Sequence, residues 1–210
     1  DVMDYVNHVL RHEGRNVTLR RFFSNLSRFN DYFETASDTY DFAFNQIFSH
    51  KGWESGGNHK AKSRVGARGI SQFMYATALD MGLRVDSYVD ERNNPKKSIL
   101  KGVEYLAEIR DSHPDWPEWM TYAAYNWGPD RMETVAKKYD TTDWAELKDR
   151  LPRETREHVM KVFAGEYILD HAEDLGFAFE QQPLWSENER YHTVKRGECL
   201  HAIASSYGVE

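Results

Sequence analysis

Hydrophobic residues in the first 176 positions recur at steps of three and four, the spacing of one face of an α-helix. The longest such stripe covers residues 19–33 and predicts a single helix. A second run, over residues 42–48, leads to Trp53, and a third, over residues 70–81, follows a glycine-rich turn. Prolines at positions 95, 117, 129 and 152 open further helical stretches, because a proline in the first turn loses no intrahelical hydrogen bond. The pattern predicts an all-α domain.

The pattern changes after Gly176. Residues 177–190 show no period and contain a proline, so we interpret them as a linker. Residues 191–210 first alternate, then turn at Gly197, and then carry apolar residues at helical spacing. We therefore predict a helical domain over residues 1–176, a linker over 177–190, and a partial strand–turn–helix unit over 191–210.

Composition narrows the class of protein. The chain has 210 residues, 40% of them hydrophobic, which is enough for one sizeable core. A formal net charge of -7 and the lack of a long basic run argue against nucleic acid as a partner. No apolar stretch approaches the ~18 residues of a transmembrane segment. The single cysteine, Cys199, excludes a disulfide framework and a multi-cysteine metal site. His8 and His12 stand four apart, but no third ligand is apparent, so we expect no metal and no cofactor.

The candidate chemistry lies between Trp53 and Met74. Glu54 follows an aromatic, apolar approach, which would desolvate its carboxyl group and raise its pKa. A carboxyl group that stays protonated near neutral pH can act as a general acid. A lone Glu before a glycine turn is also typical of a solvated helix end, so this residue alone does not decide. Gly52 costs a helix ~1 kcal/mol relative to Ala and predicts that the helix ends or bends just before Glu54.

The stretch "ESGGNHKAKSRVGARGISQFM" resembles the catalytic motif of lytic transglycosylases of the soluble-lytic-transglycosylase type. "YAAYNWGPDRM" and "LPRETREHV" resemble two later motifs of that family, in the same order. "MGLRVDSYVDERNNPKKS" is similar to the connecting segment of the membrane-bound lytic transglycosylase D subgroup. "YHTVKRGECLHAIASSYGV" resembles the first half of a LysM module, a unit that binds N-acetylglucosamine-containing glycans.

The resemblance implies a goose-lysozyme-like helical fold followed by a truncated LysM module. It implies an enzyme that cleaves peptidoglycan without water, leaving 1,6-anhydro-N-acetylmuramic acid ends, with Glu54 as acid and then base. The partners would be peptidoglycan glycan strands, the location the bacterial periplasm or cell envelope, and the protein a monomer. The substrate-binding residues carried over from the motifs are Ser63, Gln72, Met74, Tyr125 and Asn126. Ser55 and His158 are expected to modulate the cleft.

The chain departs from the family pattern at His158, where the family has Tyr. With an ordinary pKa of ~6.5, a protonated His158 would lower the pKa of Glu54, so His158→Tyr would raise activity most below about pH 6. Packing of His158 on the last helix is the alternative. Two other functions stay open: a hydrolytic muramidase on the same fold, and a peptidoglycan-binding module that has lost activity.

Overall fold

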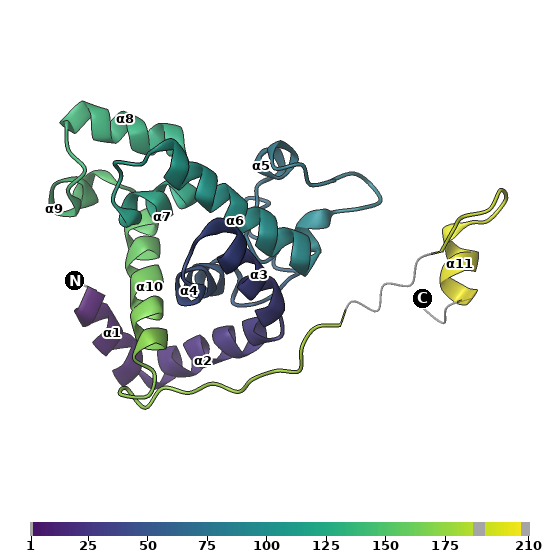
Figure 1. Ribbon diagram of the computed structural model, residues 1–210, viewed down its shortest axis with the longest axis horizontal. Coiled ribbons are helices and arrows are strands. Elements are labelled where there is room, and N and C mark those ends of the chain that lie inside the picture. The colour runs from purple at the N-terminus through teal and green to yellow at the C-terminus, as the bar shows by residue number, and fades with distance from the viewer. Residues whose placement is uncertain (1, 187–191, 207–210) are drawn as a thin grey trace.

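The structure is a computed structural model that describes residues 2–186 and 192–206, and its regular structure is almost entirely helical (Figure 1). β-structure within these residues is limited to three isolated bridges in the loops between α4 and α6. The elements in chain order are α1 (Val2–Arg11), α2 (Glu13–Ser27), α3 (Asn30–Tyr40), α4 (Phe44–Ser55), α5 (Tyr75–Asp80), η1 (Glu91–Asn93), α6 (Pro95–Ser112), α7 (Glu118–Trp127), α8 (Pro129–Tyr139), α9 (Trp144–Leu147), η2 (Lys148–Arg150), α10 (Arg153–Asp170) and α11 (Leu200–Ser206).

Helix α4 lies in the middle of the helical body, and α10, α2 and α3 pack against it (Figure 1). Phe48 of α4 contacts Phe23 of α2, with ring centroids 5.6 Å apart, and Phe33 of α3, with centroids 5.1 Å apart. Aromatic rings bury large apolar areas, so these contacts fix α4 between its neighbours. Helices α6, α7 and α10 complete the frame through contacts of α6 with α3 and α7, and of α10 with α7 and α1.

The predicted single helix over residues 19–33 is wrong, because the helix is interrupted: α2 ends at Ser27 and α3 begins at Asn30. At the break, the Ser27 hydroxyl donates to the Ser24 carbonyl, and Phe29 leaves the helical conformation with a φ of -111°. The bend lets α2 and α3 bury their apolar faces in the same core, where Leu26 and Phe33 are both fully buried. The third predicted helix is also shorter than expected, since residues 70–74 lie in a loop and α5 begins at Tyr75.

The expected bend before Glu54 is wrong as well. Helix α4 runs through Gly52 and ends at Ser55. A Cβ atom on Gly52 would lie 3.2 Å from Cε1 of Phe23, so the glycine allows a close approach of α4 to α2. The local cost of a glycine in a helix is therefore offset by tight packing between two helices.

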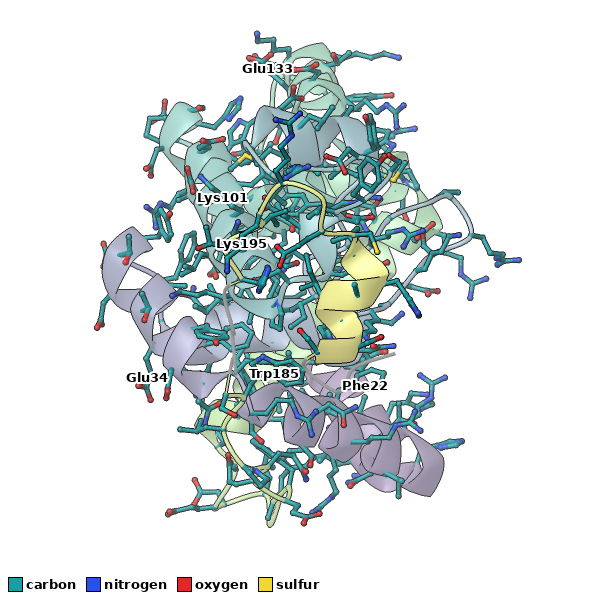
Figure 2. All side chains as sticks on the ribbon, turned by 90° about the vertical axis from the view of Figure 1, so that its right-hand side faces the viewer. Phe22, Glu34, Lys101, Glu133, Trp185 and Lys195 are labelled. Carbon is teal, nitrogen blue, oxygen red and sulfur yellow. The ribbon has the colours of Figure 1, made fainter. Side chains whose placement is uncertain are left out.

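The segment 177–185, predicted as a linker, packs along the helical domain. The Trp185 backbone N–H donates to the Arg28 carbonyl at 2.7 Å, and the Trp185 ring lies 5.6 Å from Phe29 and 4.9 Å from His59. Figure 2 shows Trp185 beside the ribbon of α2. Phe177 is buried in the main core. These contacts extend the apolar cover of α2 beyond the last helix of the domain.

The helix predicted near the C-terminus is confirmed as α11. Residues 192–195 contain no strand, although the alternating pattern predicted one. The rest of that predicted strand, at Tyr191, lies outside the described residues, as do residues 187–190 of the predicted linker and residues 207–210.

Gly69 provides a test of the packing under the 58–74 loop. Its φ is +78°, and a Cβ atom there would lie 1.7 Å from the Arg92 carbonyl oxygen. Gly82 has nearly the same φ, +77°, with no atom within 4 Å of such a Cβ. Gly82→Ala should therefore cost only the ~1–2 kcal/mol of left-handed backbone. Gly69→Ala should lower the free energy of unfolding by at least about 2 kcal/mol more. Urea denaturation of both variants measures the difference, and equal losses would contradict the close approach of Gly69 to Arg92.

Candidate active site

Glu54 lies in the last turn of α4, with its side chain 11% exposed. A cleft of about 670 Å³ opens beside it, and its walls come from α4, the 58–74 loop, α5, α6, α7, α8 and α10. Seven of the eight residues predicted for the site line this cleft: Glu54, Ser63, Gln72, Met74, Tyr125, Asn126 and His158. Ser55 is not among the described lining residues, since its hydroxyl donates back to the Lys51 carbonyl within the helix. The folded chain thus gathers three separate sequence motifs around one cavity.

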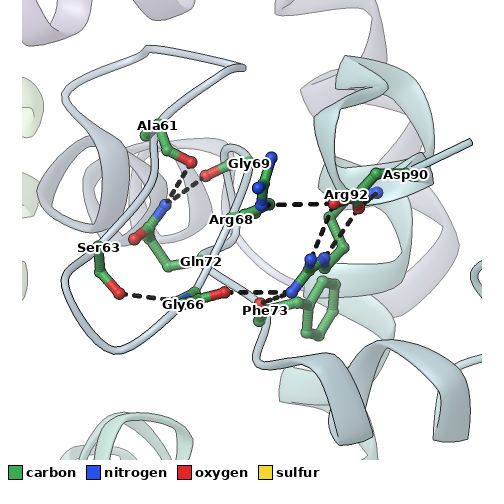
Figure 3. A network of polar contacts seen from close by, with 10 residues as sticks. Ala61, Ser63, Gly66, Arg68, Gly69, Gln72, Phe73, Asp90 and Arg92 are labelled. Carbon is green, nitrogen blue, oxygen red and sulfur yellow. Dashed lines mark hydrogen bonds and ion pairs between the residues drawn. The ribbon is translucent and has the colours of Figure 1, made fainter. Parts of the chain in front are cut away.

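One wall of the cleft is a loop held in place by a buried arginine (Figure 3). The Arg92 guanidinium is bound by Asp90, with Nη2 2.8 Å from Oδ2. From Nη1 it donates to the carbonyl oxygens of Gly66 at 3.2 Å and Phe73 at 3.3 Å. A planar guanidinium can bind several acceptors at once, so Arg92 ties the middle and the C-terminal end of the loop to η1.

The same loop orients two of the predicted substrate-binding residues. Gln72 has a φ of 48°, and its Nε2 donates to the Gly69 carbonyl at 2.8 Å (Figure 3). The Ser63 hydroxyl accepts from the Ala67 N–H at 3.0 Å. Their polar atoms are therefore partly used to hold the loop, which pre-organises the wall for a ligand.

The end of α7 is joined to the other motifs by side-chain hydrogen bonds. The Tyr125 hydroxyl donates to the Ser71 carbonyl at 2.8 Å. Asn126 Oδ1 accepts from the Thr155 hydroxyl at 2.9 Å, and the amide nitrogen of Asn126 can donate to a ligand in the cleft. Thr155 belongs to the third motif, and this hydrogen bond gives it a role there, which is to orient Asn126.

The environment of Glu54 favours a protonated carboxyl group. Burial raises the pKa of Glu54 above its ordinary value, the charge of Lys51 opposes this rise, and the charge of Glu154 adds to it. The rise in pKa expected from the sequence is thus confirmed, with desolvation as its main cause. Glu54 can therefore carry a proton at a pH where an exposed glutamate would have lost it.

Lys51 is a site residue that sequence reasoning missed. It precedes Glu54 by three positions on α4 and is fully buried. Its amine donates to the Gly102 carbonyl at 3.2 Å and lies 4.1 Å from the centroid of the Tyr125 ring. Burial lowers the pKa of Lys51 below its ordinary value, while the charge of Glu54 raises it. The helical spacing of the two residues was the available signal, because positions three apart share one face of a helix.

Two histidines adjoin Glu54. The Nε2 atom of His158 on α10 lies 3.6 Å from Glu54 Oε1, and His50 lies one helical turn before Glu54, fully buried. Burial, together with the charges of Lys51 and Lys161, lowers the pKa of His158 to about 3. The predicted switch of His158 near pH 6.5 is therefore wrong. Burial disfavours the charged imidazolium, because the protein around it does not replace the hydration that the charge would have in water.

Comparison with known proteins identifies the family. The model of the family described as "Transglycosylase SLT domain" matches residues 31–147, more than half of the chain. The chain belongs to this family. The matched range of the SLT domain covers Glu54, the 58–74 loop and Asn126, but not His158 or Thr155 of α10.

Relatives of this SLT domain are lytic murein transglycosylases. The chain is 31% identical to membrane-bound lytic murein transglycosylase F from Vibrio parahaemolyticus over 70% of its own length and 29% of that protein. It is 35% identical to the same-named protein from Thiobacillus denitrificans over 52% of its length and 24% of that protein. The 70-kDa soluble lytic transglycosylase from Escherichia coli has the same fold over 69% of this chain and 24% of that one, with 26% identity and a TM-score of 0.60. The chain thus spans less than a third of each.

Replacing Lys51 tests the electrostatics of the site. Because the charge of Lys51 lowers the pKa of Glu54, Lys51→Met should raise that pKa by about one unit. Carbon-detected NMR titration of the Glu54 carboxyl measures the shift. Lys161→Met is the matched control, since Lys161 lines the same cleft but acts on His158. A lower Glu54 pKa in Lys51→Met, or equal shifts in both variants, would contradict this account.

The corrected view of His158 gives a second expectation. Its imidazole should remain neutral from pH 8 down to pH 5, because burial keeps its pKa near 3. Nitrogen-15 NMR of the ring detects protonation directly, with free histidine in the same buffer as reference. His158→Tyr should then change activity by the same factor at pH 5.5 and pH 7.5. Protonation of His158 within this range would restore the switch that the structure argues against.

Proposed function

We propose that this chain cleaves the β-1,4 bond between N-acetylmuramic acid and N-acetylglucosamine in peptidoglycan and leaves a 1,6-anhydro end. The observation that carries the proposal is the mostly buried carboxyl group of Glu54, which lines the cleft and has a raised pKa. Family membership and the lytic murein transglycosylases among its relatives support the same substrate class. Glu54 is thus the group we assign to proton transfer.

The proposed reaction uses Glu54 twice. As an acid, it protonates the glycosidic oxygen while the C1–O bond breaks. The acetamido oxygen of the substrate stabilises the developing positive charge at C1, as in substrate-assisted glycoside hydrolysis. The resulting carboxylate then takes the proton from the C6 hydroxyl of the muramoyl residue, whose oxygen bonds to C1. Glu54 ends protonated, and no water is consumed.

The cleft offers groups suited to an amino sugar. The Asn126 amide nitrogen and the Ser63 hydroxyl can bond to acetamido and hydroxyl oxygens, and Gln72 lies on the same wall. Met74 is 45% exposed at the cleft, which favours contact with a ligand over a role in core packing. Tyr125 is instead anchored through its hydroxyl, so it would present its ring face or edge.

Glu154 supports a second candidate, hydrolysis by a muramidase on the same fold. It also lines the cleft, and its charge raises the pKa of Glu54. Ordinary glycosidases use two carboxyl groups, the second acting as nucleophile or as base for water. An exposed Glu154 would supply the second carboxyl group, and a protonated Glu54 would supply the acid. The two candidates differ in whether Glu154 is needed and whether water enters the product.

The finer assignments rest on sequence resemblance. A LysM-like C-terminal segment would add affinity for N-acetylglucosamine-containing glycans, and helix α11 lies where that resemblance expects a helix. Similarity to the D subgroup stays a prediction, and the two relatives described above are named membrane-bound lytic murein transglycosylase F. Action on peptidoglycan implies a place in the cell envelope, and no described helix is long and apolar enough to cross a membrane. A monomer is the expected state.

Glu54→Gln should reduce release of soluble fragments from purified sacculi by at least about 10²–10⁴-fold, the usual contribution of a general acid–base group. The amide keeps the shape of the side chain but cannot supply the proton. Circular dichroism and sacculus binding should stay close to wild type. Near-normal release by this variant would remove Glu54 from the mechanism, and binding without release by the wild type would favour a module that has lost activity.

Glu154→Gln is the matched control, and mass spectrometry of the products decides between the candidates. A lytic transglycosylase should retain most activity in Glu154→Gln and give fragments lighter by one water than hydrolysis products. Reducing ends from the wild type, together with an inactive Glu154→Gln, would establish the muramidase instead.

A further inference from the structure

We propose that His50, Glu54 and His158 form a binding site for one Zn²⁺ ion in the wall of the cleft, and that the bound ion removes Glu54 from proton transfer. Each side chain offers one ligand atom, and these atoms all lie within 4.8 Å of one another. His50 and Glu54 stand four positions apart on α4, and His158 comes from α10, which packs against α4. The site is therefore assembled by two helices of the core rather than by loops.

Unpartnered nitrogen atoms point to a ligand at this place. His50 is fully buried, and neither of its ring nitrogens has a hydrogen-bond partner among the described residues. His158 Nε2, which faces Glu54, is likewise buried without a partner in the described part of the chain. A buried polar atom left without a partner costs about 1–3 kcal/mol, so such atoms are rare unless something binds them. A metal ion would accept the lone pairs of both imidazoles.

The geometry is close to that of a zinc site. Zinc lies about 2.0–2.2 Å from nitrogen and carboxylate ligands, which places two ligands of a tetrahedral ion about 3.3 Å apart. His158 Nε2 and Glu54 Oε1 are already 3.6 Å apart. The other separations are at most 4.8 Å, so they must close by no more than roughly 1.5 Å for a tetrahedral ion.

The ligand set also matches zinc chemically. Burial lowers the pKa of His50 and of His158, so both imidazoles are neutral, the form that binds a metal. Two histidines and one glutamate are a known combination for zinc sites that keep a fourth position open. Glu54 and His158 both line the cleft, so the ion has a path of entry and its fourth position would face the ligand cavity.

Replacing Lys51 tests whether zinc binds among these three side chains, because the expected change in affinity has a definite direction. Its charge affects His50, Glu54 and His158 alike, and it would therefore repel a cation bound among them. Replacing Lys51 by Met removes this repulsion while keeping a side chain of similar length. Because the same change raises the pKa of Glu54, the affinities are compared at a pH above that pKa, where the carboxylate is ionised in both proteins. Zinc should then bind more tightly to Lys51→Met, which no site elsewhere on the surface would show.

The effect on catalysis rests on the proposed function, whereas zinc binding does not. A carboxylate that coordinates zinc cannot hold the proton that a general acid must deliver. Zinc should therefore inhibit cleavage, and removal of the ion by a chelator should restore it.

Isothermal titration of the full chain with ZnCl₂ tests the site, and the visible spectrum of a Co²⁺ complex reports nitrogen and oxygen ligands. His50→Gln and His158→Tyr should each weaken binding by more than about tenfold, because loss of a mere outer-shell partner already costs about 10–100-fold. Lys51→Met should strengthen it. The control is His8→Ala with His12→Ala, which removes an exposed histidine pair on α1 and its C-terminal flank and should leave the affinity unchanged. Circular dichroism checks each fold, and His158→Tyr carries the test if His50→Gln does not fold.

The proposal is overturned if the chain binds no zinc, if His158→Tyr binds it as tightly as the wild type, or if the His8/His12 variant loses it. Weaker binding by Lys51→Met at a pH above the pKa of Glu54 would also overturn it. An active enzyme that binds zinc at this site and cleaves at the same rate would refute the inhibition. A chain that binds zinc but never cleaves peptidoglycan would refute the proposed function and leave the metal site standing.

Discussion

Desolvation of the last turns of α4 is the constraint on which the site depends. Glu54 has a raised pKa because α4 runs through the core and α10 packs against it, which leaves the carboxyl group largely buried at the edge of the cleft. Transferring an ionised carboxylate from water into such a setting is unfavourable, and protonation relieves that cost. The aromatic packing of Phe48 against α2 and α3 therefore has a chemical consequence, since it fixes the helix whose burial sets the protonation state.

The fold class and most helix starts were predictable from the sequence. Prolines at positions 95 and 129 begin α6 and α8, Pro152 immediately precedes α10, and helical period marked α4. The break between α2 and α3 was not predictable from period, because Leu26, Phe29 and Phe33 keep regular spacing across it and all remain buried. A change of direction that preserves burial leaves no trace in a hydrophobic pattern. Gly52 led to the opposite error, a predicted helix end where the helix continues. Its low helix propensity is a local property, whereas its packing against Phe23 is a tertiary contact that the sequence does not show.

The candidate site was likewise predictable in part. Seven residues of the ordered motifs meet at one cleft, as the resemblance implied. The motifs did not reveal Arg92, because its role depends on backbone carbonyls of Gly66 and Phe73 that any sequence could supply. His50 and Lys51 were missed for another reason. Charged and polar residues on a helix are usually solvated, but the placement of α6, α7 and α10 around α4 buries these two.

The burial of Lys51 beside Glu54 gives the cleft wall a balanced charge in two forms. With a neutral His50 and a neutral His158, the pair is uncharged overall either as carboxylate with ammonium or as carboxylic acid with amine. A mechanism in which one carboxyl group first gives and then takes a proton must pass through its ionised form inside a poorly hydrated wall. A neighbouring ammonium group stabilises that form, while strong desolvation keeps the acid form accessible at the start. Lys51 thus supplies, from inside the core, the compensating charge that solvent would supply to an exposed carboxylate.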